Sequence, residues 1–195
     1  NGWSAGLAIT APWGLATEYS DNWVGRYHAL DSELRTINIT PSVAWRPLPN
    51  LSLGLGVQAQ YADAELTNAI DFGTLGAAAG LPGALPGLQD GRARVEGDDW
   101  SYGFTAGIQF RLSPATQLGL TYRSRIKHTL DGDVSFTLDR AGVGAVLQGA
   151  TGAFRNSDAR ADLTTPETIS FGIQHRIGSA WTVLAGATHT RWSRF

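Results

Sequence analysis

Residues 51–61 read LSLGLGVQAQY, and apolar residues at the odd positions alternate there with Ser, Gly and Gln at the even positions. Successive side chains of a β-strand point to opposite faces, so this stretch predicts a strand with one apolar and one polar face. An ordinary strand has roughly 5 to 6 residues. Ten steps of about 3.3 Å at a tilt near 45° cover roughly 23 Å, close to the ~25 Å apolar band of a membrane-spanning barrel. The stretch therefore predicts a strand that crosses a lipid bilayer.

The same alternation recurs in six other stretches, and their connectors are alternately short and long. The stretches are 3–13, 37–45, 100–112, 118–126, 169–177 and 181–187. The short connectors are 46–51, 113–117 and 178–181, and the long ones are 16–33, 66–99 and 131–164. This layout is typical of an all-β, transmembrane antiparallel β-barrel with short periplasmic turns and long extracellular loops. We expect Trp45, Phe110 and Trp181 at the periplasmic rim, and Trp13, Tyr61 and Trp100 at the outer rim.

Composition agrees with a membrane wall and argues against several other classes. Charged residues make up 16% of the chain, against roughly 25% in a typical soluble protein. The net charge of -2 offers no basic surface for nucleic acid, and the absence of cysteine excludes disulfides and thiolate metal sites. The four histidines lack metal-ligand spacing, so we expect no metal, no cofactor and no catalytic residues. The alternative fold is a soluble antiparallel sandwich, which also alternates but has shorter strands.

Several segments resemble the long-chain fatty acid transporter family of bacterial outer membranes, which also includes transporters for aromatic hydrocarbons. The matching segments are GLATEY at 14–19, LRTIN at 34–38, PSVAW at 41–45, residues 51–66, LTYRS at 120–124 and WSRF at 192–195. The resemblance covers essentially the whole chain. It implies a 14-stranded barrel with an N-terminal hatch, which takes up hydrophobic molecules and releases them sideways into the bilayer.

By this comparison residues 1–195 form a partial barrel domain, holding the third to ninth strands without the hatch, the first two strands and the last five. Phe195 is then an internal position and not the terminal aromatic residue of a barrel. The resemblance also implies the outer membrane of a Gram-negative bacterium, contact with membrane lipid and lipopolysaccharide, and a full-length protein that is monomeric.

The second and third long connectors are apolar where a solvated loop is normally polar, and exposed apolar surface favours ligand binding. The candidate substrate-binding residues are Phe72, Leu75, Leu81, Leu85, Leu88, Val143, Val146, Leu147 and Phe154. Val143, Val146 and Leu147 have helical spacing. The alternative is that the two loops pack on each other. The resemblance implies an external hydrophobic groove that captures substrate first.

Arg123, Arg125 and Lys127 alternate along one predicted strand, so we expect them on one side, facing the lumen, where they could pair with a carboxylate head group. The alternative is a general lumen charge, or pairing with Asp63 and Glu65. Fatty-acid members of the family can carry a base just past the strand that corresponds to residues 51–61, the third in this chain. This chain has Asn68 there, which questions fatty-acid specificity.

Pro12 and Gly14 interrupt the first predicted strand, because proline cannot donate to a ladder and glycine weakens it. Their positions coincide with the inward kink through which the family is thought to release substrate, so they are candidates for a lateral gate. The alternative is an ordinary strand end.

These expectations predict passive uptake of hydrophobic molecules, foremost long-chain fatty acids, with aromatic hydrocarbons as a substrate variant. A non-specific water-filled porin or an adhesion-type barrel is the alternative. No set of nucleophile, base and acid gathers at one rim, so we expect no enzyme.

Overall fold

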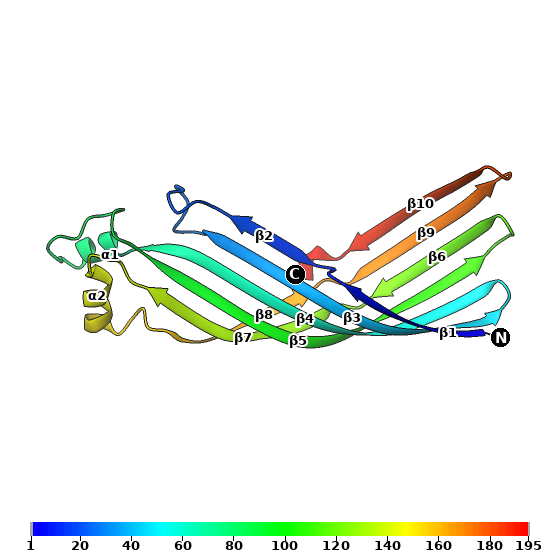
Figure 1. The fold of residues 1–195 in the computed structure, drawn as a ribbon, viewed down its shortest axis with the longest axis horizontal. Coiled ribbons are helices and arrows are strands. Elements are labelled where there is room, and N and C mark those ends of the chain that lie inside the picture. The colour runs from blue at the N-terminus through cyan, green and yellow to red at the C-terminus, as the bar shows by residue number, and fades with distance from the viewer. Residues whose placement is uncertain (1, 195) are drawn as a thin grey trace.

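The computed structural model describes residues 2–194 and consists of one antiparallel sheet with ten strand segments and two short helices (Figure 1). The strands are β1 (Gly2–Thr10), β2 (Gly14–Glu18), β3 (Asp31–Leu48), β4 (Leu51–Asp71), β5 (Asp90–Arg111), β6 (Thr116–Arg123), β7 (Ile126–Thr137), β8 (Ser157–Thr165), β9 (Thr168–Ile177) and β10 (Trp181–Thr190). The helices are α1 (Phe72–Ala78) and α2 (Val143–Thr151), followed at the end by a 3-10 turn, Trp192–Arg194. Phe195 lies outside the described residues.

Within residues 2–194 the ten segments run as seven paths, because three paths are interrupted. The interruptions lie at 11–13, 124–125 and 166–167. The seven predicted strands are therefore confirmed, as is the all-β antiparallel class. The short connections gather at one end of the sheet, the turn end, and α1 and α2 lie at the opposite end, the loop end (Figure 1). Neither helix of the described chain is long and apolar enough to cross a membrane.

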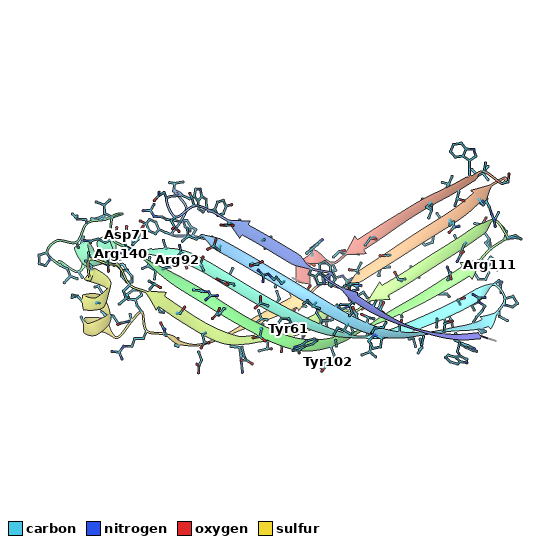
Figure 2. All side chains as sticks on the ribbon, viewed as in Figure 1. Tyr61, Asp71, Arg92, Tyr102, Arg111 and Arg140 are labelled. Atoms are coloured by element: carbon cyan, nitrogen blue, oxygen red, sulfur yellow. The ribbon has the colours of Figure 1, made fainter. Side chains whose placement is uncertain are left out.

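The strands extend past the predicted rim, so all three expected long loops are shorter than the sequence indicated. β4 continues from Tyr61 to Asp71, and β5 begins at Asp90, ten residues before Trp100. Labelled Tyr61 and Tyr102 lie partway along the strands, with Asp71 at the loop end and Arg111 towards the turn end (Figure 2). The expected loop boundaries 16–33, 66–99 and 131–164 were wrong, because the ladders continue where the outward-facing residues change from apolar to charged.

The two faces of the sheet differ as the alternation predicted. The outer face exposes large apolar side chains, including Leu55, Val57 and Phe104 at 62%, 59% and 51%. The inner face carries buried amides: Asn38 Nδ2 donates to Gln58 Oε1 at 3.0 Å, and Gln58 Nε2 donates to the Phe104 carbonyl at 2.8 Å. A polar inner face and an apolar outer face are what a wall between water and lipid requires.

Two of the interruptions change which side chains face inwards. β1 pairs with β3 up to Thr10 and Asn38, and β2 resumes with Gly14 opposite Arg35. Residues 11–13 therefore face only residues 36–37. Similarly, residues 124–130 face only residues 99–104 of β5, between the β6 and β7 ladders. Each interruption holds one residue more than the opposite strand. Because the side-chain period of a strand is two, one extra residue exchanges the two faces beyond it.

Candidate functional site

The first interruption turns Trp13 towards the inner face and fixes it to β3. The Trp13 amide donates to Thr36 Oγ1 at 3.0 Å, and the same hydroxyl donates to the Trp13 carbonyl at 2.6 Å. Thr36 is 2% exposed. Pro12, just before, has no amide to leave unpaired. The two hydrogen bonds of the Thr36 hydroxyl thus replace the backbone hydrogen bonds that are missing at residues 11–13.

Trp13 and Pro12 line a cavity of about 310 Å³ on the inner face, here called the lumen cavity. Its other walls are Arg123 and the hydroxyl residues Thr168, Ser170, Thr188 and Thr190. The Trp13 ring meets Trp192 edge-on, with 5.3 Å between centroids. One cation, several hydroxyls and an indole ring therefore surround one space, a combination that can hold a polar head group beside an apolar chain.

This placement corrects two expectations. Trp13 was expected at the outer lipid rim, and it lies at the lumen cavity instead because of the extra residue at 11–13. Arg123, Arg125 and Lys127 were expected on one face. Arg123 is half-buried at the lumen cavity, but beyond the second interruption Ile126 and His128 occupy the buried inner positions. Lys127 therefore lies on the outer face.

Within residues 2–194 none of these three bases forms an ion pair with Asp63 or Glu65. Glu65 accepts two hydrogen bonds from Arg94, at 2.7 and 2.9 Å. This Arg94 guanidinium lowers the pKa of Glu65, with burial opposing the shift. Arg123 has no acidic partner within residues 2–194. Its charge is available to a ligand.

Most of the apolar loop residues pack α1 against α2. Phe72, Val143 and Leu147 are buried and form a small core, against which Leu81 and Phe154 are partly buried. The Phe72 and Phe154 rings meet edge-on at 5.0 Å. This matches the alternative that the two loops pack on each other, and it makes these five residues the support of the loop end.

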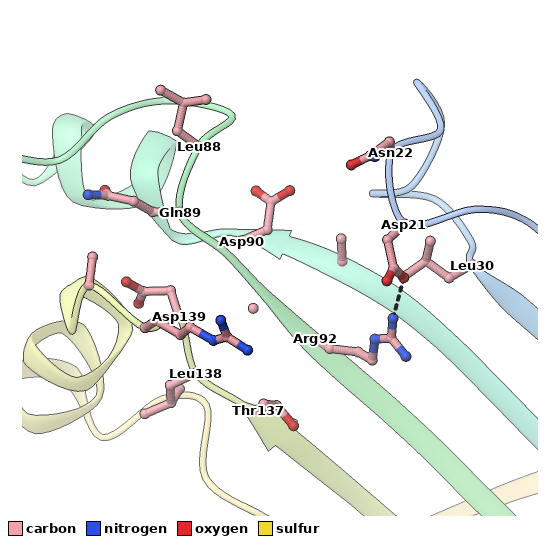
Figure 3. A pocket seen from close by; sticks show the side chains of 14 residues that line it. Asp21, Asn22, Leu30, Leu88, Gln89, Asp90, Arg92, Thr137, Leu138 and Asp139 are labelled. Atoms are coloured by element: carbon pink, nitrogen blue, oxygen red, sulfur yellow. Dashed lines mark hydrogen bonds and ion pairs between the residues drawn. The ribbon is translucent and has the colours of Figure 1, made fainter.

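Four other candidates remain on the surface: Leu75, Leu85, Leu88 and Val146 are 41%, 53%, 77% and 53% exposed. Of these, Leu88 borders a hollow of about 570 Å³ between the three long connections, here called the loop pocket (Figure 3). Leu30, Ala69 and Leu138 add apolar surface to it.

The loop pocket also holds charged side chains that no sequence pattern predicted. Arg92 pairs with Asp21 across the pocket (Figure 3). Arg140 lines the same space and has no ion-pair partner within residues 2–194. Asp139 is occupied because it accepts hydrogen bonds from the Val143 and Gly144 amides at the start of α2. No sequence signal marks Arg140, since its position depends on how the loops meet.

The loop connecting β2 and β3 is anchored to the second loop by a compact polar cluster. Arg26 Nε donates to Asp90 Oδ2 at 2.7 Å, and the Tyr27 hydroxyl donates to Asp90 Oδ1 at 3.0 Å. Burial and the hydrogen bond to Asp90 raise the pKa of Tyr27 to about 12. Burial alone would raise the pKa of Asp71, but hydrogen bonds from Thr74 and the Gly87 amide lower it. These contacts hold the loop pocket in shape.

Pro12 and Gly14 are the candidates for a lateral gate. Pro12 lies within the first interruption, and Gly14 is the first residue of β2 after it. Pro12 lines the lumen cavity, whereas Gly14 is already paired with Arg35 in β2. Asn68 donates to the neighbouring Ala69 carbonyl at 3.0 Å. Among the described residues no group of three or more His, Asp or Glu side chains could hold a metal ion.

The chain is similar in sequence to known outer membrane transport proteins. The family model described as outer membrane protein transport protein (OMPP1/FadL/TodX) matches residues 1–195. The chain is 32% identical over 210 residues to the long-chain fatty acid transport protein of Escherichia coli O6:H1. It is 34% identical over 201 residues to that of Salmonella typhi. Each match covers 100% of this chain and 46% of the relative, so the chain spans about half the length of these relatives.

Solved structures share the same sheet. A crystal structure of a Pseudomonas aeruginosa FadL homologue matches with a TM-score of 0.84 and 28% identity, over 98% of this chain and 46% of that one. The Pseudomonas putida toluene transporter TodX matches with a TM-score of 0.61 and 16% identity, over 98% of this chain and 52% of that one, which shows likeness of fold alone. The transmembrane β-barrel class predicted from the alternation is confirmed. The chain belongs to the OMPP1/FadL/TodX family of outer membrane transport proteins.

Proposed function

We propose that the complete protein carries hydrophobic molecules passively across the outer membrane, with long-chain fatty acids as its main substrates. The observation that carries this proposal is the lumen cavity, where the unpaired Arg123 lies beside Trp13 and next to the interrupted strand. A carboxylate can pair with the guanidinium, while an alkyl chain gains about 0.8 kcal/mol per buried CH₂.

The test compares two probes in liposomes that contain the full-length parent protein. Arg123→Gln is expected to raise the half-saturating concentration of a fluorescent long-chain fatty acid about tenfold, because it removes one charge-assisted interaction of about 1.4 kcal/mol. Uptake of an uncharged aromatic probe should not change. Arg46→Gln, which removes an exposed cation at the turn end, is the matched control. If Arg123→Gln reduced the uptake of both probes equally, a role of Arg123 in binding the carboxylate head group would be refuted.

Capture is assigned to the loop end. The exposed Leu75, Leu85, Leu88 and Val146 supply apolar surface, and Arg140 in the loop pocket supplies a cation for the carboxylate. Phe72, Leu81, Val143, Leu147 and Phe154 act indirectly by holding the two helices together. Leu88→Ala should therefore weaken capture without altering the stability of α1 and α2.

Exit is assigned to the first interruption, where Pro12 cannot donate to a ladder.

The names of the relatives support both substrate classes, since some are fatty acid transport proteins and TodX is a toluene transporter. If the parent accelerates uptake of the aromatic probe but not of the fatty acid, the hydrocarbon variant holds. Large single-channel currents would instead favour the water-filled porin.

We also propose that the complete protein has no enzymatic activity, needs no cofactor and binds no nucleic acid. It acts as a monomer when complete, closed as a 14-stranded barrel with a hatch, and it is surrounded by membrane lipid and lipopolysaccharide. Residues 1–195 would then be the partial barrel domain of that protein. A monodisperse trimer in detergent would contradict the monomer.

A further inference from the structure

The second interruption leaves a polar hollow on the lipid-facing side of the sheet. The β5–β6 ladder reaches Thr105 and Arg123, and the β5–β7 ladder begins at Asp98 and Asp131, so the wall between them has no regular pairing. A hollow of about 500 Å³ lies there. Tyr102, Phe104 and Tyr122 line it from the outer face, and Arg125, Glu167 and Arg191 provide its charges.

These charges lie at the depth of the outer membrane rim. Glu167 is ten residues from Ile177 and Arg191 is ten residues from Trp181, counted from the turn that joins β9 and β10. Arg125 is nine residues from Thr116, the start of β6. At about 3.3 Å per residue and a tilt near 45°, each lies roughly 21 to 23 Å above the turns, the far edge of the apolar band.

All of them face outwards. Glu167 and Arg191 continue the outward series of β9 and β10, in which Ile169 pairs with His189 and Phe171 with Ala187. Tyr122, which pairs with Ala106 on the outer face, donates its hydroxyl to Glu167 Oε2 at 3.1 Å. Lys127, two residues beyond Arg125, is exposed on the same face.

The acid in the hollow is already neutralised. Arg191 pairs with Glu167 at 2.6 Å. Neither Arg125 nor Lys127 has an ion-pair partner within residues 2–194. Two unpaired cations therefore face the lipid at the level where its head groups lie. Each cation near a membrane surface is attracted to anionic head groups by about 1 kcal/mol, and a guanidinium matches the geometry of a phosphate.

We propose that Arg125 and Lys127, with Tyr102 and Tyr122 beside them, form a binding site for a phosphate group of an outer-leaflet glycolipid. The site is separate from the lumen cavity, and it holds a lipid of the surrounding membrane and not a transported molecule. It fixes the depth of the barrel wall where its ladder is interrupted. It does not depend on the transport activity proposed above.

The experiment measures binding of lipid A to the full-length parent protein in detergent by native mass spectrometry. The lipids are bisphosphorylated lipid A and the same lipid without its phosphates, and inorganic phosphate serves as competitor. Arg125→Gln combined with Lys127→Gln should weaken binding of the bisphosphorylated lipid about tenfold, and the dephosphorylated lipid should bind weakly to every variant. Arg46→Gln, a cation removed from the turn end, should bind as the wild type does.

Arg125→Lys keeps the charge and guards against loss of folding, so it should retain most of the binding. Equal binding of both lipids to the wild type, or wild-type binding by the double variant, would overturn the site. Complete displacement of lipid by millimolar inorganic phosphate would assign the site to free phosphate and overturn the lipid assignment.

Discussion

The Thr36 hydroxyl is expected to hold residues 11–13, which interrupt the first strand path, against β3. It accepts from the Trp13 amide and donates to the Trp13 carbonyl, at 3.0 and 2.6 Å, and it is almost fully buried. Thr36→Val has a similar shape but removes both bonds. Each buried group left unpaired costs about 1–3 kcal/mol, so closure of the interruption should lose at least about 2 kcal/mol.

This loss can be measured by amide hydrogen exchange of a peptide covering residues 9–16 in the full-length protein. A change of about 2 kcal/mol corresponds to roughly thirtyfold faster exchange of the Trp13 amide, at 1.4 kcal/mol per tenfold. Ser42→Ala is the control, because Ser42 also donates from β3 to the backbone of β1, to the Gly6 carbonyl at 3.3 Å, but is more exposed. Unchanged exchange in Thr36→Val would refute the role of the hydroxyl.

Three further predictions concern the loop end and the upper ladders. Phe72→Ala should cost about 3–5 kcal/mol in the packing of α1 on α2, seen as faster protease cleavage of residues 72–89; unchanged cleavage would contradict it. Tyr27 stabilises the folded loops fully below pH 10, its ordinary pKa, and this contribution should fade as pH rises towards the folded pKa of about 12. The difference in tyrosinate absorbance between wild type and Tyr27→Phe should then have its midpoint near pH 12, and a midpoint near 10 would be against it. A Cβ at Gly132 would collide with the Glu96 carbonyl oxygen, so Gly132→Ala should loosen the β5–β7 ladder in hydrogen exchange by about 1–3 kcal/mol. Gly149→Ala, which meets nothing within 4 Å, should not, and equal effects would refute the steric argument.

The membrane part of the sheet could be predicted from the sequence because its two faces meet different media. Leu51 to Tyr61 alternates in hydropathy since one face meets lipid and the other the lumen. Above the rim the outer face is charged, whereas the inner face carries buried apolar side chains such as Leu34, Ala62 and Leu130, so the polarity of the two faces is reversed although the ladder persists. There the outer face places Glu33, Glu65 and Glu96 opposite one another, continued by Asp133 and Asp158. Charged strands of this kind look like loops in a hydropathy pattern.

The interruptions were only partly predictable. Pro12 and Gly14 mark the first one, because both residues disfavour a ladder. Ser124 and Arg125 carry no such mark, yet the second interruption lies there, with the Ser124 hydroxyl accepting from the Phe104 amide at 2.9 Å. Which face a side chain adopts beyond an interruption depends on the number of residues in the opposite strand, which is a property of the pairing. No sequence pattern therefore predicted that Trp13 and Arg123 meet at one cavity.

The extra residue in each of the first two interruptions has a consequence for how this family can vary in length. Deleting one residue from 124–126 would turn the residues from that point on to the opposite face, with Lys127 towards the lumen and the buried His128 towards lipid. Deleting or inserting two residues would leave both faces as they are. Relatives that keep the upper wall should therefore differ at these interruptions by even numbers of residues, so that evolution changes the length of the wall in pairs.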